Sequence, residues 1–561
     1  MKNKIAIFLA ALIAIIPTYL TAQEFQIDDS DRPFGEYLTA RHALFNHQYD
    51  VAAENYLHAV RLDPENVELL QFSMNVFVAA GRFEDALDNA NKLRELNEEN
   101  DVSNLIHFFD LVRNKNYEEA LPTIDGLAST GIMNLVKPIF KSWIYAEQGN
   151  FEEISKIAES YEGEDGSFNF FNFFQMGLIY EYIGELEKAE SYYSRGLAER
   201  GLTNLRAVEA YSKILRKLGK LEEAELALNQ YIETAPGNEN LKSELDALHN
   251  NEASTPLVSS LEEGYAELFY TVATILMQDN VKGIATNFLQ YALVFKTEFP
   301  LAHFMQAQIF ESDEYYNGAA DQLARIKNDS PLYFQSKLQR AWLFDEMDRS
   351  EETIAALREI EKEYPNNREV LNSIAEFYRL HERFAEAIPA YTKVIETIEN
   401  ETERDWIVYY TRGIVFDQEK RWPEAESDFK KALQLRPEQP MVLNYLAYSW
   451  VDQGVNYELA KKMLIRAVEL RPNDGYIVDS LGWALYKMGD EEEAVEVLER
   501  AAQLQTQDWA INDHLGDAYW TVGRKNEARF QWRHALSLSP DESDAEVIKS
   551  KIENGYVKPD F

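Results

Sequence analysis

Apolar and small residues recur along this chain about every 34 positions, and inside each period they follow helical spacing. In the clearest period, residues 509–542, the recurring positions are Leu515, Gly516, Tyr519, Gly523, Ala528, Trp532, Ala535 and Pro540. Intervals of three and four residues put such side chains on one face of an α-helix. Gly523 interrupts the pattern in its middle and Pro540 ends it, as expected at helix ends. Each period therefore predicts two helices joined by a turn, which together form a helical hairpin.

The same positions recur upstream through most of the chain, in about 14 repeats. Gly482 and Gly516 occupy the position where the two helices of a hairpin cross, and a missing side chain there lets the backbones approach. Gly489 and Gly523 suit the left-handed conformation that ends a first helix. One hairpin cannot bury its apolar face alone, so stability is expected to come from the stacking of neighbours.

This spacing resembles the tetratricopeptide repeat, a helix–turn–helix unit of about 34 residues. The resemblance covers nearly the whole chain and implies an all-α fold, a right-handed α-solenoid of about 14 units in two sub-arrays. Such an array is a surface for holding other chains and carries no chemistry by itself. It also implies that the first helices of the hairpins line a concave face.

The repeat is interrupted once, after Pro236. Residues 241–249 are predicted to form a lone helix, residues 250–256 a loop, and Ser259 or Ser260 the cap of the next helix. The predicted organisation is a disordered N-terminus at 23–32, an N-terminal array at 33–238, a hinge at 239–262, a C-terminal array at 263–542, and a capping helix and tail at 543–561.

The N-terminus has the pattern of an export signal. Lys2 and Lys4 precede an apolar run, and residues 18–22 are typical of a cleavage region. This predicts a secretory signal peptide over residues 1–22 and a periplasmic protein that is peripheral to the outer membrane at most. The alternative is an uncleaved anchor, although the run is short for a span of about 20 residues. The chain has no Cys, so it offers no lipid acceptor, disulfide or thiol nucleophile.

Charge and motifs narrow the function further. The formal net charge of −41 argues against nucleic acid as a partner. Glutamate pairs such as Glu492-Glu493 begin second helices, where the positive end of the helix dipole favours them. The sequence has no phosphate-binding loop, metalloprotease, serine-hydrolase or EF-hand motif, and its nine His residues are scattered. We therefore expect no enzyme activity, no cofactor and no metal site.

A first candidate binding surface lies in three late repeats. The positions of their first helices that are offset from the packing positions are Met441, Asn444, Tyr448, Tyr476, Asp479, Trp483, Tyr486, Asp513, Asp517 and Trp520. Large aromatic side chains outside core positions are typical of binding hot spots. The alternative is that these rings pack between adjacent repeats, because an error of one residue in the phase moves a side chain off the face.

A second candidate surface lies upstream, where residues 167–174 are rich in Phe. The offset positions there are Phe171, Phe174, Leu178 and Tyr182, and those of the following repeat are Arg206, Lys213, Arg216 and Lys217. An apolar patch beside a basic rim, in so acidic a chain, predicts a receptor for an acidic or C-terminal peptide. The alternative is a thick core beside a solvated basic face.

Three segments, residues 443–450, 464–468 and 479–483, carry a narrower likeness. They resemble exported tetratricopeptide proteins of Gram-negative bacteria. One group of these comprises lipoproteins that serve as adaptors for a periplasmic carboxyl-terminal processing protease and its cell-wall hydrolase substrates. This chain departs from that group in having no Cys for lipid attachment, and it also lacks the basic residues of the chaperone-binding carboxylate clamp.

The expected function is that of an exported scaffold or adaptor. Its partners would be proteins or peptides bound on the concave face, with an envelope protease or its substrates implied by the narrower resemblance. The alternative is a periplasmic binding module for a small ligand or glycan, because aromatic faces stack on sugars as readily as on peptide side chains.

Overall fold

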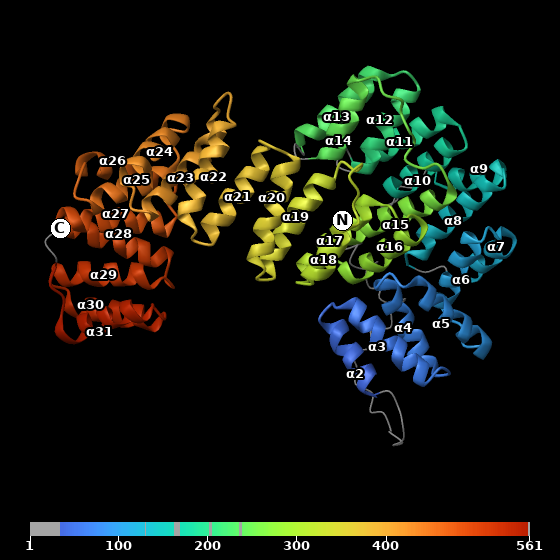
Figure 1. Cartoon of the computed structure of the whole chain (residues 1–561), viewed down its shortest axis with the longest axis horizontal. Coiled ribbons are helices and arrows are strands. Elements are labelled where there is room, and N and C mark those ends of the chain that lie inside the picture. Colours follow the sequence, from blue (N-terminus) through green and yellow to red (C-terminus); the bar gives the residue numbers. More distant parts are fainter. Residues whose placement is uncertain (1–33, 129–130, 162–168, 201–204, 235–237, 559–561) are drawn as a thin grey trace. The chain divides into compact units, whose positions relative to one another are not determined.

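The computed structural model describes residues 34–128, 131–161, 169–200, 205–234 and 238–558 (Figure 1). The predicted signal peptide at 1–22 and the segment 23–32 lie outside these residues. Within the described ranges the chain forms thirty α-helices and one short 3-10 helix, and no strand. The predicted all-α fold is confirmed. None of the described helices combines the length and hydropathy that a membrane crossing needs.

The chain divides into two compact units, which we call unit 1 (Met1–Thr353) and unit 2 (Ile354–Phe561). The earlier helices of unit 1 are α2 (Phe34–Phe45), α3 (Tyr49–Leu62), α4 (Val67–Ala79), α5 (Phe83–Leu96), α6 (Asp101–Arg113), α7 (Tyr117–Gly126), α8 (Met133–Glu147), α9 (Phe151–Ser160), α10 (Asn169–Tyr182) and α11 (Leu186–Arg200). Its later helices are α12 (Leu205–Lys217), α13 (Leu221–Thr234), α14 (Glu239–His249), α15 (Leu261–Gln278), α16 (Lys282–Phe295), α17 (Pro300–Ser312), α18 (Tyr316–Ala324) and α19 (Tyr333–Glu346).

Helix α20 (Ser350–Glu363) spans the division between the units. Unit 2 continues with α21 (Arg368–Leu380), α22 (Phe384–Glu396), η1 (Glu403–Asp405), α23 (Trp406–Gln418), α24 (Trp422–Leu435), α25 (Pro440–Asp452), α26 (Tyr457–Leu470), α27 (Gly475–Met488), α28 (Glu491–Leu504), α29 (Trp509–Thr521), α30 (Lys525–Ser537) and α31 (Glu542–Asn554). Consecutive helices pack as hairpins, as α27 and α28 or α29 and α30 do.

The hairpin of α29 and α30 shows why the repeat spacing produces this structure. A Cβ built on Gly516 would lie 2.4 Å from the Trp532 side chain, so only glycine allows the two helices to cross this closely. Gly523, in the turn between them, has a φ of +86°, which glycine tolerates better than residues with a side chain. The Asp508 side chain accepts a hydrogen bond from the backbone N–H of Ile511 and caps α29. The predicted roles of both glycines are confirmed.

Unit 1 departs from a simple stack, because helices α15 and α16 pack against helices much earlier in the chain. The Tyr265 hydroxyl on α15 donates a hydrogen bond to the backbone carbonyl of Phe140 on α8 (3.0 Å). The rings of Phe109 on α6 and Tyr291 on α16 lie 5.0 Å apart, edge to face. These aromatic side chains form part of one buried cluster, so α6, α8, α15 and α16 share a core.

The next hairpin extends this closure. Tyr49 on α3 stacks on Phe310 of α17 with ring centroids 5.6 Å apart. The hydroxyl of Tyr315, just before α18, donates a hydrogen bond to a carboxylate oxygen of Asp50 (3.1 Å). Helices at the start of the chain therefore contact helices about 260 residues later in the same unit.

The predicted hinge at 239–262 differs from the observed organisation. Helix α14, the irregular residues 250–260 and the cap at Ser260 are present as predicted, but they lie inside unit 1. The division between compact units falls between Thr353 and Ile354 instead. The reason is that α15 and α16 bury their aromatic side chains on α6 and α8 rather than beginning an independent array.

Candidate partner-binding surface

The first helices of three late hairpins in unit 2, α25, α27 and α29, lie next to one another, and α27 contacts both of the others. We call their shared surface the first-helix face. Two large apolar side chains on it are exposed, Met441 at 40% and Tyr476 at 56%. Asn444, Tyr448, Trp483 and Trp520 are partly exposed. The first-helix face therefore presents the apolar and aromatic character that the sequence predicted for it.

An aromatic stack lies at the centre of this face. Trp483 stacks on the His514 ring with centroids 4.0 Å apart and on the Tyr486 ring at 4.8 Å. The imidazole Nδ1 of His514 lies 3.1 Å from the carboxylate of Asp479. Burial alone lowers the pKa of His514, but the charge of Asp479 and the hydrogen bond to it raise that pKa above its ordinary value. The rings of Trp483, His514 and Tyr486 therefore stack on one another within the first-helix face.

A pair of acidic residues, the partly exposed Asp513 and the buried Asp517, adjoins the stack. Lys551 on α31 contacts the carboxylates of Asp513 and Asp517 on α29, at 2.7 Å and 2.8 Å. Asp517 also accepts a hydrogen bond from the indole Nε1 of Trp532 (2.9 Å). Burial and the nearby charge of Asp513 raise the pKa of Asp517 to about 6, against the effect of Lys551. Asp513 and Asp517, which were predicted to lie on the binding surface, thus pair with Lys551 of the same chain.

Tyr486 lies elsewhere than predicted, because it has no exposed surface. Its hydroxyl shares a hydrogen bond with Thr521 Oγ1 (3.2 Å), and the Lys558 ammonium lies 4.5 Å from the centre of its ring. Lys558 belongs to residues 555–558, which follow α31. The repeat pattern did not predict that these residues lie at this surface. No spacing in the sequence indicates this long-range contact.

The second predicted surface, in unit 1, is covered by the chain itself. Phe171 and Phe174 are each 1% exposed and belong to the core. Tyr182 is partly exposed and packs with its ring 5.5 Å from that of Trp143, and its hydroxyl donates to Glu147. The predicted apolar patch is therefore a core wall, because α15 packs on α8 and α10.

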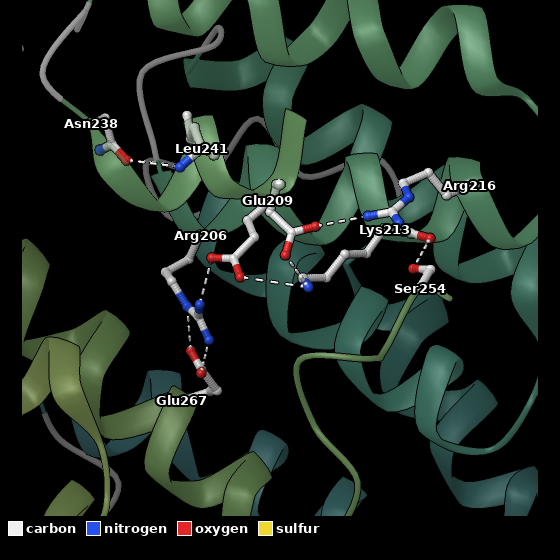
Figure 2. A network of polar contacts seen from close by, with 9 residues as sticks. Arg206, Glu209, Lys213, Arg216, Asn238, Leu241, Ser254 and Glu267 are labelled. Atoms are coloured by element: carbon white, nitrogen blue, oxygen red, sulfur yellow. Dashed lines mark hydrogen bonds and ion pairs between the residues drawn. The ribbon is translucent and has the colours of Figure 1, made fainter. Parts of the chain in front are cut away.

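The predicted basic rim of α12 is neutralised by acidic residues of the same unit. Arg206 donates to Glu267 on α15, and its guanidinium lies 2.6 Å from Glu209 (Figure 2). Lys213 pairs with Glu244 of α14 at 2.5 Å. Arg216 and Lys217 of the same rim pair with Glu244 and Glu181. Arg206 and Lys213, predicted to bind a partner, instead hold unit 1 together.

The irregular residues 250–260 run along the same helix. The Ser254 hydroxyl donates to the backbone carbonyl of Lys213 (2.9 Å), as Figure 2 shows. Arg216 donates to the backbone carbonyl of Glu252 (2.7 Å). Helix α14, this strap and α15 thus occupy the face of α12 that was predicted to receive a peptide.

Comparison with known proteins agrees with the repeat. Two family models, each described as "Tetratricopeptide repeat", match the chain, one at residues 174–239 and 338–401 and the other at 479–508 and 511–542. A stretch of 90 residues is 30% identical to TPR repeat-containing protein PA4667 of Pseudomonas aeruginosa. That stretch is 16% of this chain and 15% of the relative, so the likeness is confined to a small part of both proteins.

Solved structures of several helical-repeat proteins are also similar at low identity. YrrB, titled a TPR protein with an unusual peptide-binding site, is 22% identical with a TM-score of 0.28 over 35% of this chain and 98% of that one. The Cut9–Hcn1 hetero-tetramer of the APC/C is 16% identical with a TM-score of 0.35, over 97% of this chain and 99% of that one. Yeast Tom70 is 15% identical with a TM-score of 0.30, over 93% of this chain and 95% of that one. The narrower likeness to protease adaptors stays a prediction. The matched segments and the helical hairpins built on the repeat positions together support the tetratricopeptide repeat family for this chain.

Proposed function

We propose that this chain is an exported scaffold that binds protein or peptide segments on the first-helix face of unit 2. The observation that carries the proposal is the exposure of Met441 and Tyr476 on adjacent first helices, beside the partly exposed Tyr448 and Trp483. Exposed aromatic side chains around a rigid helical frame are the common composition of binding hot spots. The rigid frame also limits the entropy lost on binding.

Export and an envelope role form the finer part of this proposal. They rest on the charge and hydropathy pattern of residues 1–22 and on the likeness of residues 443–450 and 479–483 to exported adaptors. In this role the chain would present substrates to an envelope protease or hold an envelope complex together. N-terminal sequencing of the protein from a periplasmic fraction tests export, because cleavage is expected after Ala22. A chain that remains in the cytoplasm with Met1 in place contradicts this part alone.

Site-specific photo-crosslinking in the native host tests the binding face. A photoreactive phenylalanine analogue at Tyr476 or Met441 is expected to capture partner proteins. The same analogue at Phe530 on α30, which is 67% exposed on a second helix, is the matched control and is expected to capture none. Mass spectrometry of the adducts then identifies whether an envelope protease or its substrates are among the partners.

Substitutions then separate binding from folding. The variants Tyr448→Ala and Trp483→Ala are expected to reduce capture at Tyr476 at least about tenfold, as loss of a hot-spot residue does. Thermal unfolding of each variant is the control for the fold. Undiminished capture by folded variants, or equal capture at Phe530, contradicts the assignment of the first-helix face.

A further inference from the structure

Residues 555–558 leave the end of α31 and run back along the array to α27; we call them the return segment. The segment begins at Gly555, whose φ is +81° and where a Cβ would lie 2.4 Å from the Trp520 ring on α29. Only glycine fits this close approach to the indole without displacing it. The backbone is thus seated directly on a side chain that the repeat predicts for the binding face.

The next residue, Tyr556, places its ring among groups of the first-helix face. Burial raises the pKa of its hydroxyl above the ordinary value, and the nearby Asp517 and Tyr486 raise it further. The Lys551 ammonium lies 5.1 Å from the centre of its ring, and the ring of Trp532 is 6.4 Å away. The Tyr556 ring therefore lies between a cation and an indole, near the carboxylate of Asp517.

Lys558 is the second anchor of the return segment. Its ammonium donates to the backbone carbonyl of Tyr486 at the end of α27 (3.0 Å) and to the carboxylate of Glu491 at the start of α28 (2.8 Å). It also lies 4.5 Å from the centre of the Tyr486 ring, within cation–π range. Between the two anchors, Val557 is 88% exposed. The segment therefore makes contact in the way an extended bound peptide does, through alternate side chains.

These contacts exceed what the covering of the last hairpin requires. Helix α31 already packs on α30 and places Lys551 against α29. The return segment continues to α27 and α28, one hairpin further back, and there Lys558 lies over the ring of the buried Tyr486. The groups that receive it, Asp517 and Glu491 together with the Tyr486 ring, suit an aromatic side chain followed by a cation.

We propose that this path binds a partner protein segment that carries an aromatic residue and, two positions later, a lysine or arginine, and that the return segment is its tethered competitor. The proposal rests on the proposed function of the first-helix face and specifies the chemistry of the partner. A partner binds when it displaces the return segment. A tether of a few residues gives an effective concentration on the order of millimolar. With an intrinsic Kd of about 100 µM for this path, the return segment would weaken the binding of a competing peptide about tenfold relative to a chain whose segment is released.

Fluorescence anisotropy with the full chain tests this competition. The probe is a fluorescein-labelled synthetic peptide with the sequence of residues 554–558, Asn-Gly-Tyr-Val-Lys. It is expected to bind the double variant Tyr556→Ser/Lys558→Ser about tenfold more tightly than the wild-type chain. The variant Val557→Ser is the matched control, because that side chain is exposed, and is expected to bind as the wild type does.

Two further measurements keep the result interpretable. A second probe with Glu in place of its Lys is expected to lose binding, because the receiving groups are acidic and π-rich. The single variant Lys558→Glu leaves Tyr556 and all core residues unchanged, and it is expected to admit the first probe if the double variant proves unstable. Equal affinity of the first probe for the wild type, Lys558→Glu and Val557→Ser, or equal binding of both probes, overturns the proposal.

The failure of this inference is distinguishable from failure of the proposed function. If partners crosslink at Tyr476 but the return segment does not compete, the scaffold function is supported and only the role of the return segment as a competitor is wrong. Competition by the return segment without crosslinks at Tyr476 or Met441 removes the proposed function and keeps the peptide path. A wild-type dimer that dissociates on Lys558→Glu identifies a second copy of this chain as the occupant, which also overturns the proposal.

Discussion

Replacement of Trp532 by alanine tests the helical phase that defines both the core and the first-helix face. Trp532 has no exposed surface, its ring lies 5.3 Å from that of Trp520, and it fills the space left by Gly516. Loss of a fully buried tryptophan side chain costs about 3–5 kcal/mol. We expect the upper part of this range, because the buried carboxylate of Asp517 also loses its indole donor.

Hydrogen exchange read by mass spectrometry is the suitable assay, because long repeat arrays do not unfold in one step. A loss of about 3–5 kcal/mol corresponds to amide exchange faster on the order of 10²- to 10⁴-fold in peptides from α29 and α30. Peptides from α4 and α5 in unit 1 are expected to be unchanged, since contacts in a repeat array are local.

The matched control is Phe530→Ala, two residues away on the same helix. Phe530 is 67% exposed, so its loss is expected to cost less than about 0.5 kcal/mol. Equal protection of α29 in Trp532→Ala and Phe530→Ala would refute the assignment of Trp532 to the core. It would also shift every position that we place on the first-helix face by at least one residue.

Three further predictions concern the units separately. Glu267→Ala leaves the buried Arg206 without its partner on α15 and is expected to destabilise unit 1 by about 3–5 kcal/mol. The double variant Arg206→Met/Glu267→Met is expected to recover most of this loss, and hydrogen exchange of α12 and α15 compares the two proteins. Folding raises the pKa of Asp517 from 3.8 to about 6. Between these two values native unit 2 holds a proton that the unfolded chain releases. The stability of unit 2 is therefore expected to fall by up to about 3 kcal/mol as the pH rises from 4 to 6. Hydrogen exchange of α29 in Asp517→Asn should lack this dependence, and the same slope in both proteins would contradict the assignment. A fragment of residues 350–561 is expected to be soluble and helical by circular dichroism. A fragment of residues 263–561 is expected to aggregate, because it exposes the aromatic side chains of α15 and α16. A monomeric 263–561 fragment would contradict the observed division between the units.

Local features of the fold were predictable from the sequence, because they depend on neighbours in the chain. Gly523 marks the turn between α29 and α30, and Gly516 and Trp532 mark the crossing of those helices, as the structure confirms. The lone helix at 241–249 and the irregular residues after it were readable from their composition and cap. Each of these needs only the spacing within one repeat or the chemistry of one turn.

Contacts between distant repeats were not predictable, because a period of 34 residues reports only the packing of adjacent hairpins. Phe109 lies on α6 and Tyr265 on α15, and no spacing within either repeat indicates that α15 packs on α6 and α8. The error at the hinge and the error at Phe171 have this common origin. Tyr486 was placed on the correct helix, but it is buried, and one of the groups that contact its ring is Lys558, which lies outside the repeat.

The two units use the same kind of surface in opposite ways, and the difference lies in what covers it. In unit 1 the basic face of α12 is covered by α14, by the strap at 250–260 and by α15, an 18-residue helix whose apolar side chains belong to the core. Displacing that cover would expose the core and remove Glu267 from Arg206, so unit 1 cannot exchange it for a partner. In unit 2 the acidic face near α27 is covered by four residues that contribute one aromatic ring and one ammonium, with Val557 between them in solvent. Their release removes Lys558 from the Tyr486 ring but opens no hairpin, so the free energy needed is within reach of a competing peptide. Reversible exchange of a covering segment for a partner is therefore expected in unit 2 and not in unit 1.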